Sequence, residues 1–224
     1  MARQVPLNRL RLGATTLAFA LAGCVGTRSA VDPTVVLETA GGRELGVATD
    51  YGIVFLGRTA RAGHVDIHAF YGDGLSIEHS VIEPVGASLY TAETEILLPS
   101  VRMSFIAPRP GSKLLVAGRT PGGAWEEWVS VRRDPRVYGI LIDVPGPVRG
   151  RSDQVGAGVY WIPKRAGANE RRLIGLVSGR ILLEGESGTR EYLTVLGPDE
   201  LWRLVSHRRD HDMRRPWVYR EDIL

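Results

Sequence analysis

Short apolar runs separated by turn-forming residues recur along most of the chain, and they restrict the fold more than any other feature. The runs are rich in Val, Ile, Leu, Tyr and Phe, and Gly, Pro or Asp stands between them. They cover residues 34–39, 52–57, 65–70, 75–83, 94–99, 101–107, 113–119, 125–133, 137–143, 158–163, 172–178 and 190–196. About a dozen strands at such short spacing predict an all-β barrel or sandwich.

Alternation and capping signals refine this prediction. In the run 65–70, the apolar residues Val65, Ile67 and Ala69 occupy every second position, which predicts a strand with one buried face. One helix is expected near the C-terminus, because the stretch 197–200 (GPDE) is a helix start with acids in the first turn. Its apolar stripe would consist of Leu201, Trp202, Leu204 and Val205.

The N-terminus has the pattern of an exported lipoprotein. Residues 1–11 carry three arginines and no acid, and the apolar run 12–22 is too short to span a bilayer. It closes in the motif LAGC at 21–24, which resembles the bacterial lipobox, where the signal is cut before a cysteine that is then acylated. We therefore expect lipidation of Cys24, and because Val25 is not Asp, an outer-membrane location in the cell envelope, facing the periplasm.

Charge and cysteine content exclude several classes of protein. The formal charge is +3, but removing residues 1–23 with their three arginines leaves 28 − 3 = 25 basic against 25 acidic residues. A basic footprint for nucleic acid is therefore missing. Cys24 is the only cysteine, which rules out an internal disulfide framework and a cysteine-rich zinc site. His207 and His211 have helical zinc spacing but no obvious third ligand, and we expect no metal or other cofactor.

Three sets of stretches resemble, in order and spacing, the bacterial trypsin-like serine peptidase domain. Residues 46–74 resemble the run of its first barrel that contains the catalytic histidine strand. Residues 94–99 and 109–119 resemble its Asp-Ile-Ala-Leu-Leu stretch and a later Pro-Gly-hydrophobic strand, and residues 152–161 and 172–180 resemble its nucleophile loop and the strand that follows.

The resemblance covers about residues 44–206 and implies a chymotrypsin-like all-β fold of two packed six-stranded antiparallel barrels with a C-terminal helix. The expected organisation then has four parts. These are a signal peptide at 1–23, a lipidated tether at 24–33, a first barrel at 34–118, and a second barrel with helix and tail at 119–224.

Two of the three matched triad positions lack the family's catalytic chemistry. In such enzymes a serine attacks the carbonyl, a histidine takes its proton, and a buried carboxylate orients the histidine. The resemblance places Thr59 at the histidine, Glu95 at the carboxylate and Val155 at the nucleophile. Threonine cannot accept a proton near neutral pH, and valine has no hydroxyl. Asp153 falls at the oxyanion position, where its charge would repel a developing anion.

A second register leaves an active site open. Gly150 to Asp153 reads as Gly-x-Ser-x, which makes Ser152 the nucleophile at the cost of three extra residues before the following strand. His79 would then be its base, although it lies one strand later than the family places its histidine.

These observations favour a membrane-anchored lipoprotein with a degenerate peptidase fold that acts by binding a peptide or an envelope protein in the cleft between the barrels. The expected partners are the membrane, through the N-terminal lipid, and that peptide or protein. One alternative is an active serine endopeptidase using Ser152 and His79. The other is a structural lipoprotein that only spaces a partner from the membrane.

Overall fold

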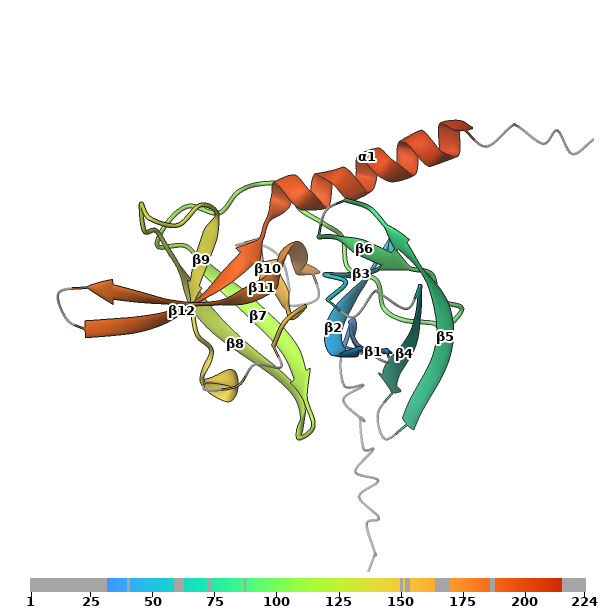
Figure 1. Cartoon of the computed structure of the whole chain (residues 1–224), viewed down its shortest axis with the longest axis horizontal. Helices are drawn as coiled ribbons and strands as arrows, with labels where there is room; N and C mark the ends of the chain where they lie inside the picture. The colour runs from blue at the N-terminus through green and yellow to red at the C-terminus, as the bar shows by residue number, and fades with distance from the viewer. Residues whose placement is uncertain are drawn as a thin grey trace, which may run out of the picture.

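The computed structural model describes residues 32–39, 41–58, 63–71, 74–86, 88–149, 151, 154–163, 170–185 and 188–214. Within these residues, twelve strands form two closed antiparallel barrels of six strands each, and one α-helix follows them (Figure 1). The all-β two-barrel fold with a C-terminal helix is therefore confirmed.

The first barrel closes in the order β1-β2-β3-β6-β5-β4. The predicted alternation explains its interior, since Val65, Ile67 and Ala69 are buried in its core together with Ile53 and Phe55. Its strands are β1 (Thr34–Thr39), β2 (Gly42–Thr49), β3 (Gly52–Phe55), β4 (His64–Tyr71), β5 (Gly74–Pro84) and β6 (Tyr90–Ala92).

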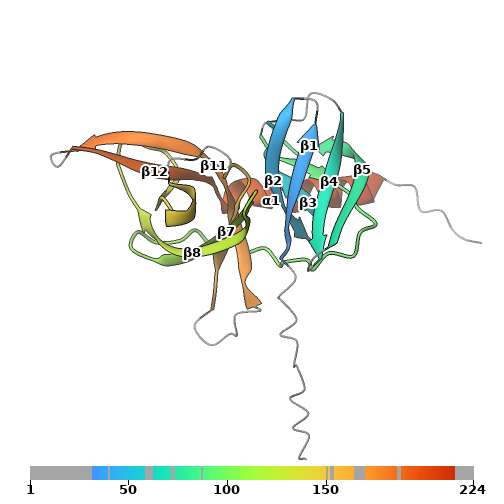
Figure 2. The same ribbon diagram turned by 90° about the horizontal axis from the view of Figure 1, so that it is seen from below.

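The second barrel closes in the order β10-β11-β12-β9-β8-β7. The apolar side chains of Leu114, Val116, Ile142, Val159 and Leu193 are fully buried in its core. Its elements are β7 (Lys113–Thr120), β8 (Gly123–Arg132), β9 (Ile140–Asp143), the short 3₁₀ helix η2 (Gly146–Val148), β10 (Gly158–Trp161), β11 (Arg172–Gly185) and β12 (Gly188–Leu196). The far halves of β11 and β12 project beyond the barrel as a hairpin (Figures 1 and 2).

Helix α1 (Pro198–Arg214) starts directly after β12 and lies along the first barrel (Figure 1). Leu201 and Leu204 are fully buried in a cluster that holds residues of both barrels, including Val47 and Tyr160. Trp202, expected in the apolar stripe, is 47% exposed and packs edge-on against the ring of Phe105. The helix thus ties the barrels together, and no helix of the described residues is both long and apolar enough to cross a membrane.

The segment between the barrels corrects two expected strands and one expected boundary. Residues 94–99 and 101–107 form no strand, while the strands β2 and β6 had not been expected. Residues 101–104 instead cross from barrel to barrel, because the Val101 N–H bonds to Ala48 of the first barrel and the Ser104 N–H to Leu173 of the second. The boundary expected between residues 118 and 119 would divide β7, which belongs wholly to the second barrel. The boundary therefore lies within residues 93–112.

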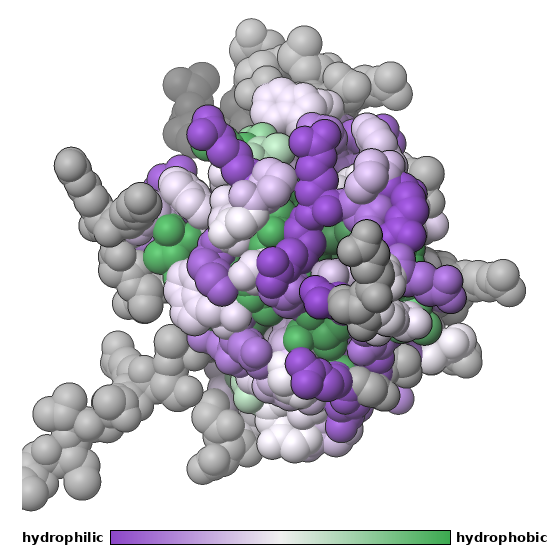
Figure 3. All heavy atoms as spheres, turned by 90° about the vertical axis from the view of Figure 1, so that its left-hand side faces the viewer, coloured by the Kyte–Doolittle hydropathy of each residue, from purple (hydrophilic) through white to green (hydrophobic). Residues whose placement is uncertain are grey.

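Figure 3 views the molecule from the side of the β11/β12 hairpin. Hydrophilic side chains cover most of this face, and small apolar areas lie between them.

Candidate functional site

The candidate site is a cavity of about 520 Å³ where the end of β3, from the first barrel, meets the start of β10 and the middle of β11. Two backbone bonds fix the junction, from Leu45 N to Val155 O at 3.0 Å and from Gly156 N to Val177 O at 2.8 Å. The residues that line the cavity are Arg58, Arg151, Gln154, Val155, Ser178, Gly179, Arg180 and Thr194. We call this cavity the cleft.

Val155 forms the apolar wall of the cleft. Its side chain is 8% exposed and packs into the cluster shared by the two barrels. The next residue, Gly156, has a φ of +86°, and a Cβ there would lie 1.8 Å from the carbonyl oxygen of Leu45. Only glycine fits this close approach, so the chain holds Val155 in one place against the first barrel.

Arg58 reaches the cleft from the other barrel. It follows β3, and its Nη2 donates a hydrogen bond of 2.5 Å to the carbonyl oxygen of Ser178 on β11. Thr59, the position that the resemblance assigned to the histidine, lies outside the described residues. The sequence analysis passed over Arg58, although a cation two residues after the apolar run 53–56 was a signal that the strand ends at a charged site.

β11 offers an unpaired edge beside Arg58. β12 pairs with it as far as Gly185, whereas β10 pairs with it only between Arg172 and Leu176. Within the described residues, no strand pairs with this side of β11 after that point. Ser178 stands at the register shift between Val177 and Gly179, where the ladder with β12 is interrupted.

Arg180 braces the opposite wall of the cleft. Its Nη1 donates to the carboxylate of Glu191 on β12, so the charge of Arg180 is compensated. Its Nη2 donates to the carbonyl of Val148 at 3.0 Å and also to the carbonyl of Arg151. The guanidinium therefore holds the segment after η2 against the second barrel.

A second cavity of about 430 Å³ adjoins the cleft, because Arg58 and Ser178 line both. Ser88, which precedes β6, and Glu200, in the first turn of α1, also line it. The sequence analysis had singled out neither residue, because only the packing of β6 against β3 brings Ser88 to this corner.

Glu95, expected as the triad carboxylate, is held elsewhere. Its backbone N–H donates to the Glu78 carboxylate on β5 at 3.0 Å, and Glu95 lines another cavity that shares no residue with the cleft. The structure therefore does not bring Glu95 beside Val155. The reason is the register, since the last strand of the first barrel is β6 at Tyr90–Ala92 and not the expected run 94–99.

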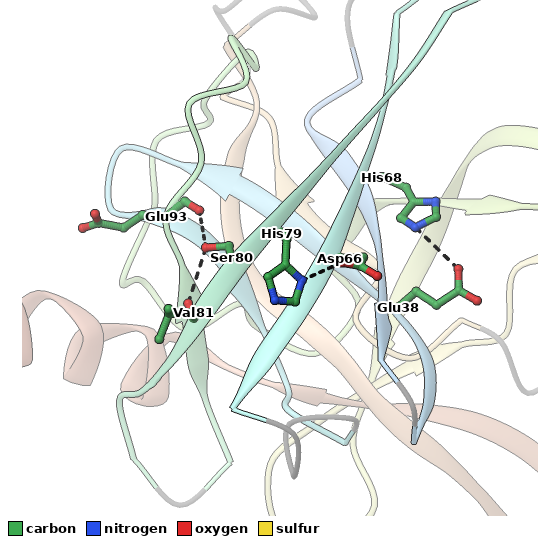
Figure 4. Close-up of polar contacts among 7 residues, drawn as sticks. All are labelled: Glu38, Asp66, His68, His79, Ser80, Val81 and Glu93. Atoms are coloured by element: carbon green, nitrogen blue, oxygen red, sulfur yellow. Dashed lines mark hydrogen bonds and ion pairs between the residues drawn. The ribbon is translucent and has the colours of Figure 1, made fainter.

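His79, the base of the alternative active site, also lies away from the cleft. It sits on β5, which Figures 1 and 2 place on the side of the first barrel away from the second. Its Nδ1 is 2.8 Å from Asp66 Oδ1 (Figure 4). Its ring stacks on that of His64, with the centroids 5.0 Å apart. Ser152 and Asp153 lie outside the described residues, as does Cys24.

The described residues contain no group of three His, Cys, Asp or Glu side chains arranged to hold a metal ion. His68 and His79 of the first barrel each lie beside a single carboxylate. His68 Nε2, for example, lies 3.5 Å from Glu38 Oε2 (Figure 4).

No protein-family model and no curated protein sequence matches the chain. Solved structures do match. The MamO protease domain from Magnetospirillum magneticum has a TM-score of 0.54 at 16% identity, over 80% of this chain and 97% of that one. A serine endoprotease from Yersinia pestis has a TM-score of 0.54 at 14% identity, over 82% of this chain and 65% of that one.

The active form of the Rv3671c protease from M. tuberculosis has a TM-score of 0.53 at 13% identity, over 92% of this chain and 94% of that one. These likenesses show that the chain has the chymotrypsin-like fold.

Proposed function

We propose that this protein is a catalytically inactive member of the chymotrypsin-like fold that binds an extended peptide in the cleft between its barrels. The observation that carries the proposal is the edge of β11, which is unpaired from Ser178 onward and begins directly beside Val155.

Two side chains that line the cleft support the proposed inactivity. Acyl transfer by a serine peptidase needs a hydroxyl nucleophile and a base that can take its proton. Val155 has no hydroxyl, and the Arg58 guanidinium has no acceptor atom that could take a proton. His79 is turned to solvent on β5 and bonded to Asp66.

Peptide binding follows from the strand edge. An unpaired edge presents main-chain N–H and C=O groups that an extended peptide can pair with, and neighbouring pockets then choose among its side chains. Two cavities flank this edge at Ser178, so a bound strand would have room for side chains next to the first barrel.

The proposal includes a membrane anchor. It is supported by the basic segment 1–11, the apolar run 12–22 and the motif LAGC, whose cysteine is the only one in the chain. Several acyl chains on Cys24 would hold the protein on a membrane, with the barrels in the periplasm at the outer membrane.

Peptide binding can be tested with a positional-scanning library of synthetic heptapeptides, each amidated at its C-terminus, and the chain from Val25 onward as bait. We expect specific capture that a Gly179→Leu variant reduces about tenfold, because the added side chain fills the cleft next to Arg58 and Thr194. Gly122→Leu, in the β7/β8 turn, is the matched control. If the folded chain captures nothing, the peptide-binding proposal is overturned.

Inactivity can be tested with a fluorophosphonate probe and the intact mass of the same chain. We expect no adduct. An adduct that disappears in Ser152→Ala would show a working serine hydrolase and overturn the proposal.

A further inference from the structure

Arg58 carries a charge that no described carboxylate neutralises. Its bond is to a neutral carbonyl, and it takes part in no ion pair within the part of the chain that the structure describes. Arg180, in the same cleft, is paired with Glu191. Among the described residues that line the two cavities, Glu200 in the adjoining one is the single carboxylate. Among the residues that the structure describes, the lining of the cleft holds three arginines and no carboxylate, which makes it a cationic site.

A buried amide in the same cleft also lacks a partner. Gln154 is 2% exposed, lines the cavity, and has no hydrogen-bond partner for its Oε1 within the described residues. A buried acceptor without a donor is unfavourable, and a main-chain N–H of a bound peptide is a donor that would remove this penalty.

We propose that the cleft selects peptides that carry a carboxylate, an inference that rests on the proposed function. The carboxylate draws the Arg58 guanidinium away from the Ser178 carbonyl. A guanidinium binds a carboxylate through two charge-assisted hydrogen bonds, which are stronger than one bond to a neutral carbonyl. The Ser178 oxygen is then released and accepts a main-chain N–H of the same peptide.

The same contact protects the protein when no ligand is bound. An unpaired strand edge invites other chains to pair with it. Arg58 covers the carbonyl of Ser178, at the point where the unpaired edge begins, and adds a positive charge beside it. A peptide without a carboxylate has to compete with Arg58 for the Ser178 carbonyl. An acidic peptide instead offers the guanidinium a carboxylate, which is a stronger partner than that carbonyl.

The heptapeptide library tests this selectivity. We expect Asp or Glu to be enriched at one position, and replacement of that residue by Asn or Gln to weaken binding about tenfold. The loss should shrink at high salt, because screening weakens an exposed ion pair. A second library with free C-termini shows whether the carboxylate comes from a side chain or from the end of the peptide.

Two variants of Arg58 separate its charge from its structural role. Arg58→Gln should abolish the acidic preference, and Arg58→Glu should shift enrichment to Lys or Arg at the same position. Arg133→Gln, which removes an exposed arginine of the second barrel that does not line the cleft, should keep the acidic preference. Folding of each variant is checked by its thermal unfolding transition.

The outcomes distinguish the two proposals. If no peptide is captured, peptide binding fails and the acidic selectivity fails with it. If peptides bind the wild type with no acidic preference, or if Arg58→Glu keeps that preference, peptide binding stands and the role of Arg58 is wrong.

Discussion

Glu78 shows how one carboxylate fixes a segment that forms no strand of its own. Burial raises the pKa of Glu78, but hydrogen bonds from the Thr94 hydroxyl and from the backbone N–H groups of Glu95 and Ile96 outweigh it and lower the pKa below 4.5. The segment after β6 is therefore held on β5 by an ionised side chain, which is why Glu95 does not approach the cleft.

This gives a prediction for stability against pH. Because the pKa of Glu78 is lower in the folded chain than in the unfolded one, its stabilising contribution is complete above pH 4.5 and is lost as the pH falls through the folded value. Glu78→Gln should lower the free energy of unfolding by about 1 kcal/mol at pH 7, and the gap to wild type should narrow at pH 3. Urea unfolding at both pH values measures this, with exposed Glu95→Gln as the control. An equal gap at both pH values would contradict it.

Across the cleft and the adjoining cavity, the sequence analysis located Val155 and missed residues such as Arg58 and Ser88. Val155 was located because the glycines after it set the register, and the structure places it on the cleft wall. Arg58 and Ser88 were missed because their importance arises from contacts with distant residues, such as the bond from Arg58 to Ser178. A register read from local motifs cannot supply such contacts.

At the scale of elements, apolar patterning predicted most strands, including the buried strand β3, but it missed β2. Residues of β2 from Glu44 to Thr49 are all buried, because one face packs in the first barrel and the other meets the second barrel, so no alternation marks this strand. The strand prediction for residues 94–107 failed for the opposite reason. It is apolar, yet Leu97 and Ile106 are 89% and 70% exposed on a connection that crosses between the barrels.

Gly156, which precedes β10, offers a test of how tightly the second barrel packs against Leu45 of the first. Gly156→Ala places a Cβ against the Leu45 carbonyl and forces a side chain into a positive φ, so we expect it to lower the free energy of unfolding by about 3 kcal/mol and to weaken peptide capture. Gly188→Ala is the control, because its φ is also positive, at +101°, but nothing lies within 4 Å of the added Cβ. It should cost about 1 kcal/mol. Thermal and urea unfolding compare them, and equal losses would show that the close approach to Leu45 is unimportant.

At the scale of the whole molecule, the cleft exists only because the two barrels and α1 share one apolar cluster. Leu56 and Val47 of the first barrel, Leu173 of the second and Leu204 of the helix all belong to it. The resemblance to the peptidase family implied two barrels, but the relative placement that brings Arg58 to β11 depends on this shared packing.

The proposed anchor is also a property of the whole chain. Cys24 precedes the first residue of β1, Thr34, by ten residues, which can span at most about 35 Å when extended. Cys24→Ser should move the protein from the membrane fraction to the soluble fraction of cells, because no acyl chains can be added to serine. Immunoblots of fractionated cells measure this, and a variant that remains with the membrane would contradict the assignment.

The central claim is that β11 binds an extended peptide along its unpaired edge, and amide hydrogen exchange of the folded chain with and without a captured heptapeptide tests it most directly. We predict slower exchange in β11 from Ser178 toward Leu182 when the peptide is bound, with exchange in β5 unchanged. Protection on β5 or elsewhere, with β11 unchanged, would contradict the account.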